Sequence, residues 1–251
     1  MKIQVYGQGQ HLVWLPGWGM PSAVFTPLVE ALSDRYTFHL VELADGGYAG
    51  EGRQWECTYL AKKIAEQVPP AIWFGWSMGG IIALQAALIN RQILGLVLLA
   101  TTPSFVRSER WVHGLPLSQL MQFSYELKVN PMRTCQRFNA LCSLGSKQAQ
   151  CERLYLNHLT KQYEISTDIL DAGLRLLMNT DLSRDIQAIE VPSLWLGGQH
   201  DRLIAPSGVE AAAAMMKNSQ VTLLSGTAHI PFIGCSQKQT VGCIARFLAS
   251  I

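Results

Sequence analysis

Apolar and polar residues along the first 103 positions follow patterns that predict strands and helices in turn. Short apolar runs predict buried strands at 11–15, 36–43, 71–76 and 93–100. Helical spacing of apolar residues predicts helices at about 22–32, 58–68 and 78–90. Because consecutive parallel strands need a crossover, this alternation predicts a parallel sheet wound by helices.

The alternation stops after position 103. From 104 to about 180 the pattern predicts helices only, with breaks near 114–116, 130–131 and 145–146. Strand patterns return at 193–197 and 221–224, and a last helix is predicted at 237–249. We therefore expect an α/β core formed by 1–103 and 181–251, with an all-helical cap inserted at 104–180.

Composition narrows the class of protein. The chain has 251 residues, of which 49% are hydrophobic and 15% charged, so a large core is expected and disorder is not. No apolar run approaches the roughly 18 residues of a membrane helix, and the start of the chain lacks a signal-peptide pattern. Six cysteines without a C-x-x-C pair are typical of reduced thiols in a cytoplasmic protein. The net charge of +2 by itself identifies no partner.

One stretch carries the main chemical signal. Gly75-Trp76-Ser77-Met78-Gly79 lies between a predicted strand and a predicted helix, which is the context that a G-x-S-x-G nucleophile elbow requires. A serine on such a sharp turn needs near-absent side chains two residues to either side, because the chains approach closely there. Ser77 is therefore the candidate nucleophile.

A serine nucleophile needs a base, and the base needs an acid to orient it. Asp201 and His229 follow the predicted strands that end near 197 and 224, in the order Ser, acid, His that this elbow implies. Both therefore belong to the sheet edge that carries Ser77. The simpler interpretation makes Asp201 a turn residue and His229 a satisfied polar group. The rival base is His200, and the rival acids are Asp181 and Asp185.

An oxyanion needs two preorganised N–H donors. The N–H of Met78 directly follows the nucleophile, and the loop after the first predicted strand offers the N–H of Trp18. The alternative role for Trp18 is that of a core aromatic residue. The sequence has no H-E-x-x-H, no Walker A loop and no G-x-G-x-x-G after the first strand, and 45–52 is expected to be a plain loop.

The predicted cap is basic. Between Lys128 and Lys161 there are six basic residues and one acidic residue, a charge of +5, which leaves −3 for the rest of the chain. This pattern indicates either a docking surface for an acidic partner or a solvated helix face. Arg133 and Arg137 share one face of a predicted helix. An apolar stripe on the same helix could line the site, and it consists of Cys135, Phe138, Leu141 and Cys142.

Taken together, these residues resemble the α/β-hydrolase superfamily over the whole chain. More closely, the chain resembles the family of esterases that act on the methyl ester of pimeloyl-acyl-carrier protein in biotin synthesis. The elbow is common to the superfamily. The segments that carry the closer resemblance are Pro16-Gly17-Trp18-Gly19, Arg133-Thr134-Cys135-Gln136-Arg137-Phe138-Asn139-Ala140-Leu141 and Ala228-His229-Ile230-Pro231-Phe232.

The resemblance implies a cytoplasmic serine carboxylesterase with an α/β-hydrolase fold and no cofactor or metal. It implies that Arg133 and Arg137 contact an acidic acyl carrier protein. It also implies that the segment Phe138, Asn139, Ala140, Leu141 and Cys142 lines the acyl channel. We expect no nucleic-acid or membrane partner, and we expect a monomer.

The chain departs from the family pattern in three places. Pro16 stands where the superfamily often has histidine, and the loop at 44–47 differs from the usual turn. The match also fades after Gly145, so that Arg153 is only a weak candidate for carrier binding. Two other functions remain open for the same fold. One is a C–C hydrolase or lactonase acting on a small molecule, and the other is a binding protein without catalysis.

Overall fold

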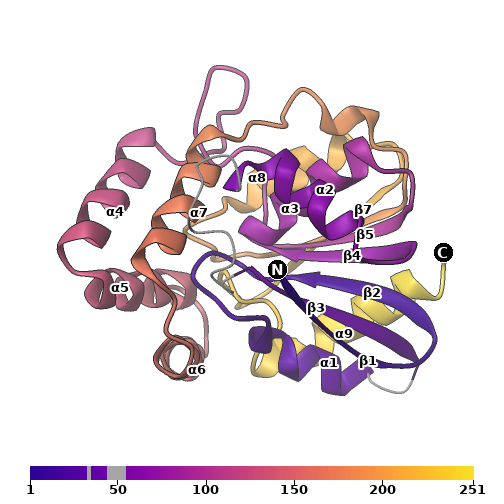
Figure 1. The fold of residues 1–251 in the computed structure, drawn as a ribbon, viewed down its shortest axis with the longest axis horizontal. Coiled ribbons are helices and arrows are strands. Elements are labelled where there is room, and N and C mark those ends of the chain that lie inside the picture. The colour runs from indigo at the N-terminus through magenta and orange to yellow at the C-terminus, as the bar shows by residue number, and fades with distance from the viewer. Residues whose placement is uncertain (33–34, 44–54) are drawn as a thin grey trace.

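The computed structural model describes residues 1–32, 35–43 and 55–251, apart from the side chain of Cys235. Its centre is a seven-stranded sheet in the order β1-β3-β2-β4-β5-β6-β7 (Figure 1). The expected loop at 44–52 lies outside the described residues.

The strands form one mostly parallel sheet, as the sequence predicted. Only β1 runs antiparallel, against β3, and every other neighbouring pair is parallel. The seven strands are β1 Lys2–Gly7, β2 Gln10–Leu15, β3 Tyr36–Glu42, β4 Ala71–Trp76, β5 Ile93–Leu99, β6 Ser193–Gly198 and β7 Ser219–Leu224. Because β2 to β7 run in the same direction, their carboxyl ends meet at one edge of the sheet, where open α/β sheets bind ligands.

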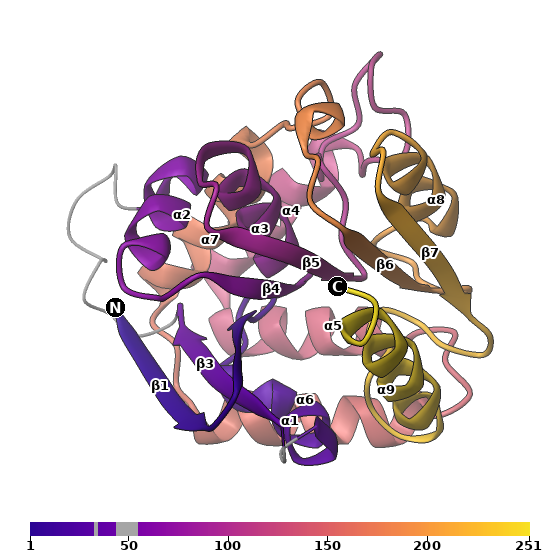
Figure 2. The same ribbon diagram turned by 90° about the vertical axis from the view of Figure 1, so that its right-hand side faces the viewer.

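Helices cover both faces of the sheet (Figure 2). One face packs against α2 Cys57–Ala65, α3 Met78–Ile89 and α8 Pro206–Ala214, and the other packs against α1 Thr26–Leu32 and α9 Cys235–Leu248. Side chains of β4 alternate between these two cores, so that Trp73 faces α3 and Phe74 faces α1 and α9. Every residue of β4 is buried, as expected for a central parallel strand.

Four helices lie between β5 and β6 in the chain and gather at one end of the molecule (Figure 1). They are α4 Leu117–Val129, α5 Pro131–Ser143, α6 Ala149–Gln162 and α7 Thr167–Asn179. The prediction of helices only from position 104 is wrong for 104–116, which is irregular. Two isolated β-bridges hold this segment in place, from Ser104 to Asp181 and from Val106 to Leu115.

One strand and one α-helix of the described residues were missing from the prediction. Strand β1 lies at the sheet edge and is largely exposed, so it shows no buried apolar run. Helix α8 begins with Pro206 at its first position and continues into a run of alanines. Both features favour a helix, and they were the signal that could have predicted it.

Candidate active site

The elbow at Ser77 has the backbone strain that its motif implies. Ser77 is the N-cap of α3 and has φ 54° and ψ −117°, a left-handed conformation that is rare for a residue with a side chain. A methyl group at Gly79 would overlap the carbonyl oxygen of Leu15, and one at Gly75 would overlap the backbone of Gly79 and Gly80. The two motif glycines are therefore required by close backbone contact between β2, β4 and α3.

Hydrogen bonds fix the backbone of this turn. The N–H of Ser77 donates to the carbonyl of Leu99 at 2.9 Å, and the Thr101 hydroxyl donates to the carbonyl of Ser77 at 2.8 Å. The Thr101 side chain also lies where a Cβ on Gly80 would have to go. No role for Thr101 was predicted from the sequence, although its position just after β5 was an available signal. These contacts hold the strained serine in one position and direct its side chain out of the sheet edge.

Asp201 and His229 form a buried pair at the same edge. Nδ1 of His229 lies 2.8 Å from Oδ2 of Asp201, and both side chains are buried. The other oxygen of Asp201, Oδ1, accepts the N–H groups of Leu203 and Ile204 at 2.8 and 2.9 Å. A carboxylate fixed at both oxygens can orient the imidazole ring and stabilise its cation.

The backbone of His229 is held from two further sides. Its backbone N–H donates to the carbonyl of Cys142 at the end of α5, at 3.0 Å. The indole of Trp76, one residue before Ser77, donates to the carbonyl of His229 at 2.9 Å. Nε2 of His229 is buried and has no hydrogen-bond partner among the described residues. With Nδ1 donating to Asp201, Nε2 is the nitrogen that remains able to accept a proton.

The rival residues are placed differently. His200 is exposed, and its backbone N–H, not its ring, contacts the histidine loop, at the carbonyl of Thr227. Asp181 is exposed and accepts the N–H of Ser183 at 2.9 Å, as a turn residue does. Asp185, the other rival acid, is exposed beside a short helix. No ion pair joins any of the three to His229 in the part of the chain described.

The two expected oxyanion donors, Met78 and Trp18, belong to α3 and to the loop after β2. Met78 is the first residue of α3, and the first N–H groups of a helix lack acceptors within it. Trp18 follows β2 and lines the same cavity as Ser77. Its indole nitrogen donates to the carbonyl of Leu170 in α7 at 2.7 Å, which fixes the buried side chain. The backbone N–H groups of Met78 and Trp18 stay the predicted donors to a developing negative charge.

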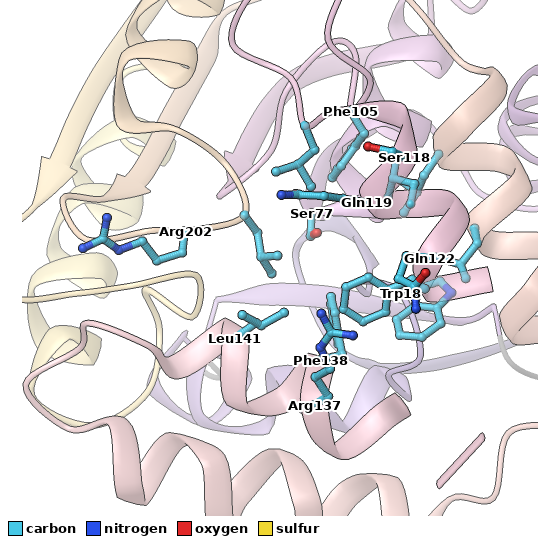
Figure 3. Close-up of a pocket in the computed structure, with 16 residues that line it drawn as sticks. Trp18, Ser77, Phe105, Ser118, Gln119, Gln122, Arg137, Phe138, Leu141 and Arg202 are labelled. Carbon is cyan, nitrogen blue, oxygen red and sulfur yellow. The ribbon is translucent and has the colours of Figure 1, made fainter. Parts of the chain in front are cut away.

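A cavity of about 330 Å³ opens in front of Ser77 (Figure 3). Most of its wall is apolar and comes from α4, α5 and α7, with Phe123 from α4 and Phe138 from α5 among the larger side chains. The rings of Phe138 and Trp18 meet edge to face, with centroids 4.8 Å apart. Such a cavity suits an aliphatic chain that ends at the serine.

The predicted channel segment divides between the cavity and the core. Phe138 and Leu141 line the cavity, whereas Asn139, Ala140 and Cys142 are not part of its lining. The amide of Asn139 is buried and donates to Asn157 and Thr160 of α6. Cys142 is fully buried, and its carbonyl holds His229.

Two arginines, Arg137 and Arg202, border the cavity. Arg137 was expected to contact the carrier protein. Arg137 lines the cavity, forms an ion pair with Glu126 of α4 and lies over the ring of Phe123, 4.9 Å from its centroid. Arg202 lines the cavity from the opposite side (Figure 3). Arg202 was not predicted from the sequence, although its position next to Asp201 placed it at this edge of the sheet. Arg133 is exposed on the outer surface of α5.

Within the described ranges, no group of histidine, cysteine, aspartate or glutamate residues is arranged to hold a metal ion. None of the helices in those ranges is both long enough and apolar enough to cross a membrane.

Comparisons with known proteins identify the family of the chain. Residues 57–232 match the model of a family described as "Serine aminopeptidase, S33". The chain is 40% identical over 253 residues to the pimeloyl-[acyl-carrier protein] methyl ester esterase of Xanthomonas axonopodis pv. citri, with 100% of each covered. It is 41% identical over 255 residues to the enzyme of the same name from Xylella fastidiosa, again with 100% of each covered.

Among solved structures, an esterase from Exiguobacterium antarcticum superposes with a TM-score of 0.87. The match covers 98% of this chain and 94% of that one at 19% identity. At this identity the likeness shows the fold alone, which is that of the α/β-hydrolases.

Proposed function

Since the chain belongs to the serine aminopeptidase S33 family of α/β-hydrolases and, at full length, to the pimeloyl-[acyl-carrier protein] methyl ester esterases, we propose that it hydrolyses the methyl ester of pimeloyl-acyl-carrier protein. The products are pimeloyl-acyl-carrier protein and methanol. The observation that carries the proposal is the buried His229–Asp201 pair, with Nε2 of His229 free, at the sheet edge that bears the strained Ser77.

The reaction follows from the roles of three side chains. Nε2 of His229 takes the proton of the Ser77 hydroxyl as its oxygen attacks the ester carbonyl. Asp201 keeps Nδ1 protonated and stabilises the imidazolium that forms. The N–H groups of Met78 and Trp18 stabilise the oxyanion of the tetrahedral intermediate. His229 then returns the proton to the departing methoxy group, and methanol leaves an acyl-enzyme.

Water completes the cycle by the same steps. His229 removes a proton from a water molecule, whose oxygen attacks the acyl carbonyl. The second tetrahedral intermediate collapses, the Ser77 oxygen recovers its proton from His229, and the free carboxyl group leaves. No cofactor is needed, because protons move only between water, His229 and the two leaving oxygens.

The segment at 104–180, which contains helices α4 to α7, acts in this proposal as a cap over Ser77. Its apolar wall holds the methylene chain of the acyl group, with the methyl ester at Ser77. The thioester end of the chain then points toward the carrier outside the cavity. We place the acidic carrier against the basic outer surface of α5, where Arg133 is exposed.

Charge reversal tests the carrier contact. Arg133→Glu should lower kcat/KM for the carrier-linked ester at least tenfold, mainly through KM, because remote binding contributes little to the chemical step. Turnover of a small soluble ester should stay within about twofold of wild type. Arg91→Glu is the matched control, since Arg91 is exposed just before β5, at the opposite edge of the sheet.

Arg137 needs a separate variant. Its ion pair with Glu126 and its place in the cavity wall mean that Arg137→Glu should impair both substrates. Equal losses on both substrates for Arg133→Glu would instead mean that Arg133 is structural. An unchanged carrier reaction would make the basic stretch a solvated face.

Genetic complementation tests the function as a whole. The wild-type chain should restore growth without biotin to a bacterial strain that lacks this esterase, and Ser77→Ala should not. Failure of the wild type, with turnover of a lactone or a C–C bond in its place, would reject the ester assignment.

A further inference from the structure

Helix α4 exposes an unusual row of apolar side chains. Leu117, Met121, Tyr125 and Val129 recur every fourth residue and are 46, 58, 65 and 68% exposed. Side chains four apart lie along one face of a helix, and the solvent face of a cap helix is ordinarily polar. A contiguous apolar strip of this kind marks an interaction surface more often than a plain surface.

The C-terminal end of this row lies in a groove that is also lined by cationic residues. Tyr125 and Val129 line a hollow of about 490 Å³ between α4 and α5, together with Arg133 and Arg137. Arg137 also lines the cavity that leads to Ser77. The apolar row and the cationic side chains therefore lie next to the wall of the active-site cavity, with Arg137 common to the groove and the cavity.

The groove has a net positive charge. Glu126 also lines it, and the Gln122 hydrogen bond, followed by Arg137, lowers the pKa of Glu126, so this carboxylate is charged at neutral pH. It forms an ion pair with Arg137. The guanidinium of Arg133 has no ion-pair partner among the described residues and supplies the unbalanced charge. An occupant of the groove should thus combine a carboxylate with an apolar side chain.

We propose that Tyr125 and Val129 form the apolar half of the docking surface for the acyl carrier protein, and that they receive an apolar side chain of an acidic helix while Arg133 pairs with its carboxylates. The inference rests on the proposed function and adds to it a contact that does not depend on charge. A carrier docked here lies next to the cavity wall at Arg137, as delivery of a tethered acyl chain requires.

The two halves of the surface differ in their response to salt. Salt screens exposed charge pairs over a Debye length of about 8 Å at physiological ionic strength, whereas burial of apolar area does not weaken as salt rises. Loss of the apolar half should therefore weaken carrier binding by a similar factor at low and high salt. Loss of Arg133 should weaken it mainly at low salt.

The test measures binding and turnover in the full-length protein. In a Ser77→Ala background, the affinity for the methyl-pimeloylated carrier is measured at low and high salt, with and without the pair Tyr125→Ser and Val129→Ser. We expect the pair to weaken binding at least tenfold at both salt concentrations, since buried tyrosine anchors dominate interfaces. In the Ser77 enzyme, the same pair should leave small-ester turnover within about twofold of wild type, which also reports correct folding.

Val5→Ser with Tyr6→Ser is the matched control. These two residues are 57 and 44% exposed on β1, at the edge of the sheet far from α4 (Figure 1). Carrier binding should survive this change.

Several outcomes would overturn the inference. Unchanged carrier binding in the Tyr125 and Val129 pair would do so, as would equal losses on the carrier ester and the small ester. A dimer that the pair dissociates, or binding to anionic phospholipid vesicles that the pair abolishes, with the carrier unaffected, would assign the row to another partner. Failure of the proposed function looks different, because the wild type would then bind the carrier without cleaving its methyl ester.

Discussion

The carboxyl group of Glu152 should make the folded protein less stable as the pH rises through neutrality. Glu152 lies in the first turns of α6, where it is only 1% exposed. One oxygen accepts a hydrogen bond from the Ser146 hydroxyl at 2.6 Å, and the other is buried without a partner among the described residues. The same corner between α5 and α6 binds the histidine loop, since the N–H of Lys147 donates to the carbonyl of Gly226 at 2.9 Å.

The magnitude follows from the pKa. Burial raises the pKa of Glu152 from an ordinary 4.5 to about 7, against an opposing effect of the Ser146 hydrogen bond. Below pH 4.5, the ordinary pKa that applies to the unfolded chain, folded and unfolded chains both hold the proton. The stabilising effect of the neutral carboxyl is then fully present. Between the two values the unfolded chain releases the proton first, so the free energy of unfolding falls by about 1.4 kcal/mol per pH unit. Above the higher value the loss is complete, at about 3 kcal/mol.

Glu152→Gln removes the titration while keeping the shape and the Ser146 acceptor. Its buried amide N–H adds a constant cost of about 1–3 kcal/mol that does not vary with pH. The informative quantity is therefore the difference in the free energy of unfolding between variant and wild type, measured by urea denaturation at pH 5 and pH 8. That difference should move in favour of Gln by about 2–3 kcal/mol over this interval. A difference that is constant with pH would refute the reasoning, because it would mean that the carboxylate is already charged in the folded state.

Other substitutions probe the elbow and its base. Gly79→Ala places a methyl group against the Leu15 carbonyl, so we expect a lower melting temperature and loss of esterase activity, and a variant as stable as wild type would contradict the close approach. His229→Ala should reduce kcat by about 10⁴-fold or more, whereas His200→Ala should change kcat little. If a kinetic assay gave the reverse order, His200 would be the catalytic base instead of His229. Asp201→Asn should lower kcat by about 10⁴-fold by favouring the wrong imidazole tautomer, and activity near wild type would exclude an orienting role.

Much of the fold could be predicted because buried strands leave a strong signal. The run from Ala71 to Trp76 is apolar throughout, and the structure buries every one of its residues in the middle of the sheet. Edge strand β1 gave no such signal, since it is paired on one side and mostly exposed. Hydrophobic patterns in a sequence indicate which elements are buried, so an element that buries few side chains is hard to predict.

The candidate site was predictable where function imposes backbone geometry. The glycines around Ser77 identify the elbow. The parallel direction of the strands then puts the loops after β6 and β7 at the same edge of the sheet as Ser77. The cap residues were harder to place, because helical spacing shows which residues share a face but not what that face meets. Asn139 faces α6 and Cys142 enters the core, while Phe138 and Leu141 reach the cavity.

The exposed row on α4 also escaped sequence analysis. A helix with Leu117, Met121 and Tyr125 at regular spacing normally buries these residues, so the sequence by itself suggests a core-facing stripe. In the structure the buried face of α4 is instead formed by Leu120 and Leu127. Only the folded chain distinguishes the two apolar faces of this helix.

The most direct measurement is the fate of purified methyl-pimeloyl-acyl-carrier protein, followed by mass spectrometry of the carrier together with assay of methanol. The wild type should convert the methyl ester to the free acid, release one methanol for each carrier and leave the thioester intact. Ser77→Ala should lower this rate by about 10⁴-fold or more while it remains folded and binds the carrier. Release of free carrier by thioester cleavage, or retention of more than a few per cent of the rate in Ser77→Ala, would contradict the account.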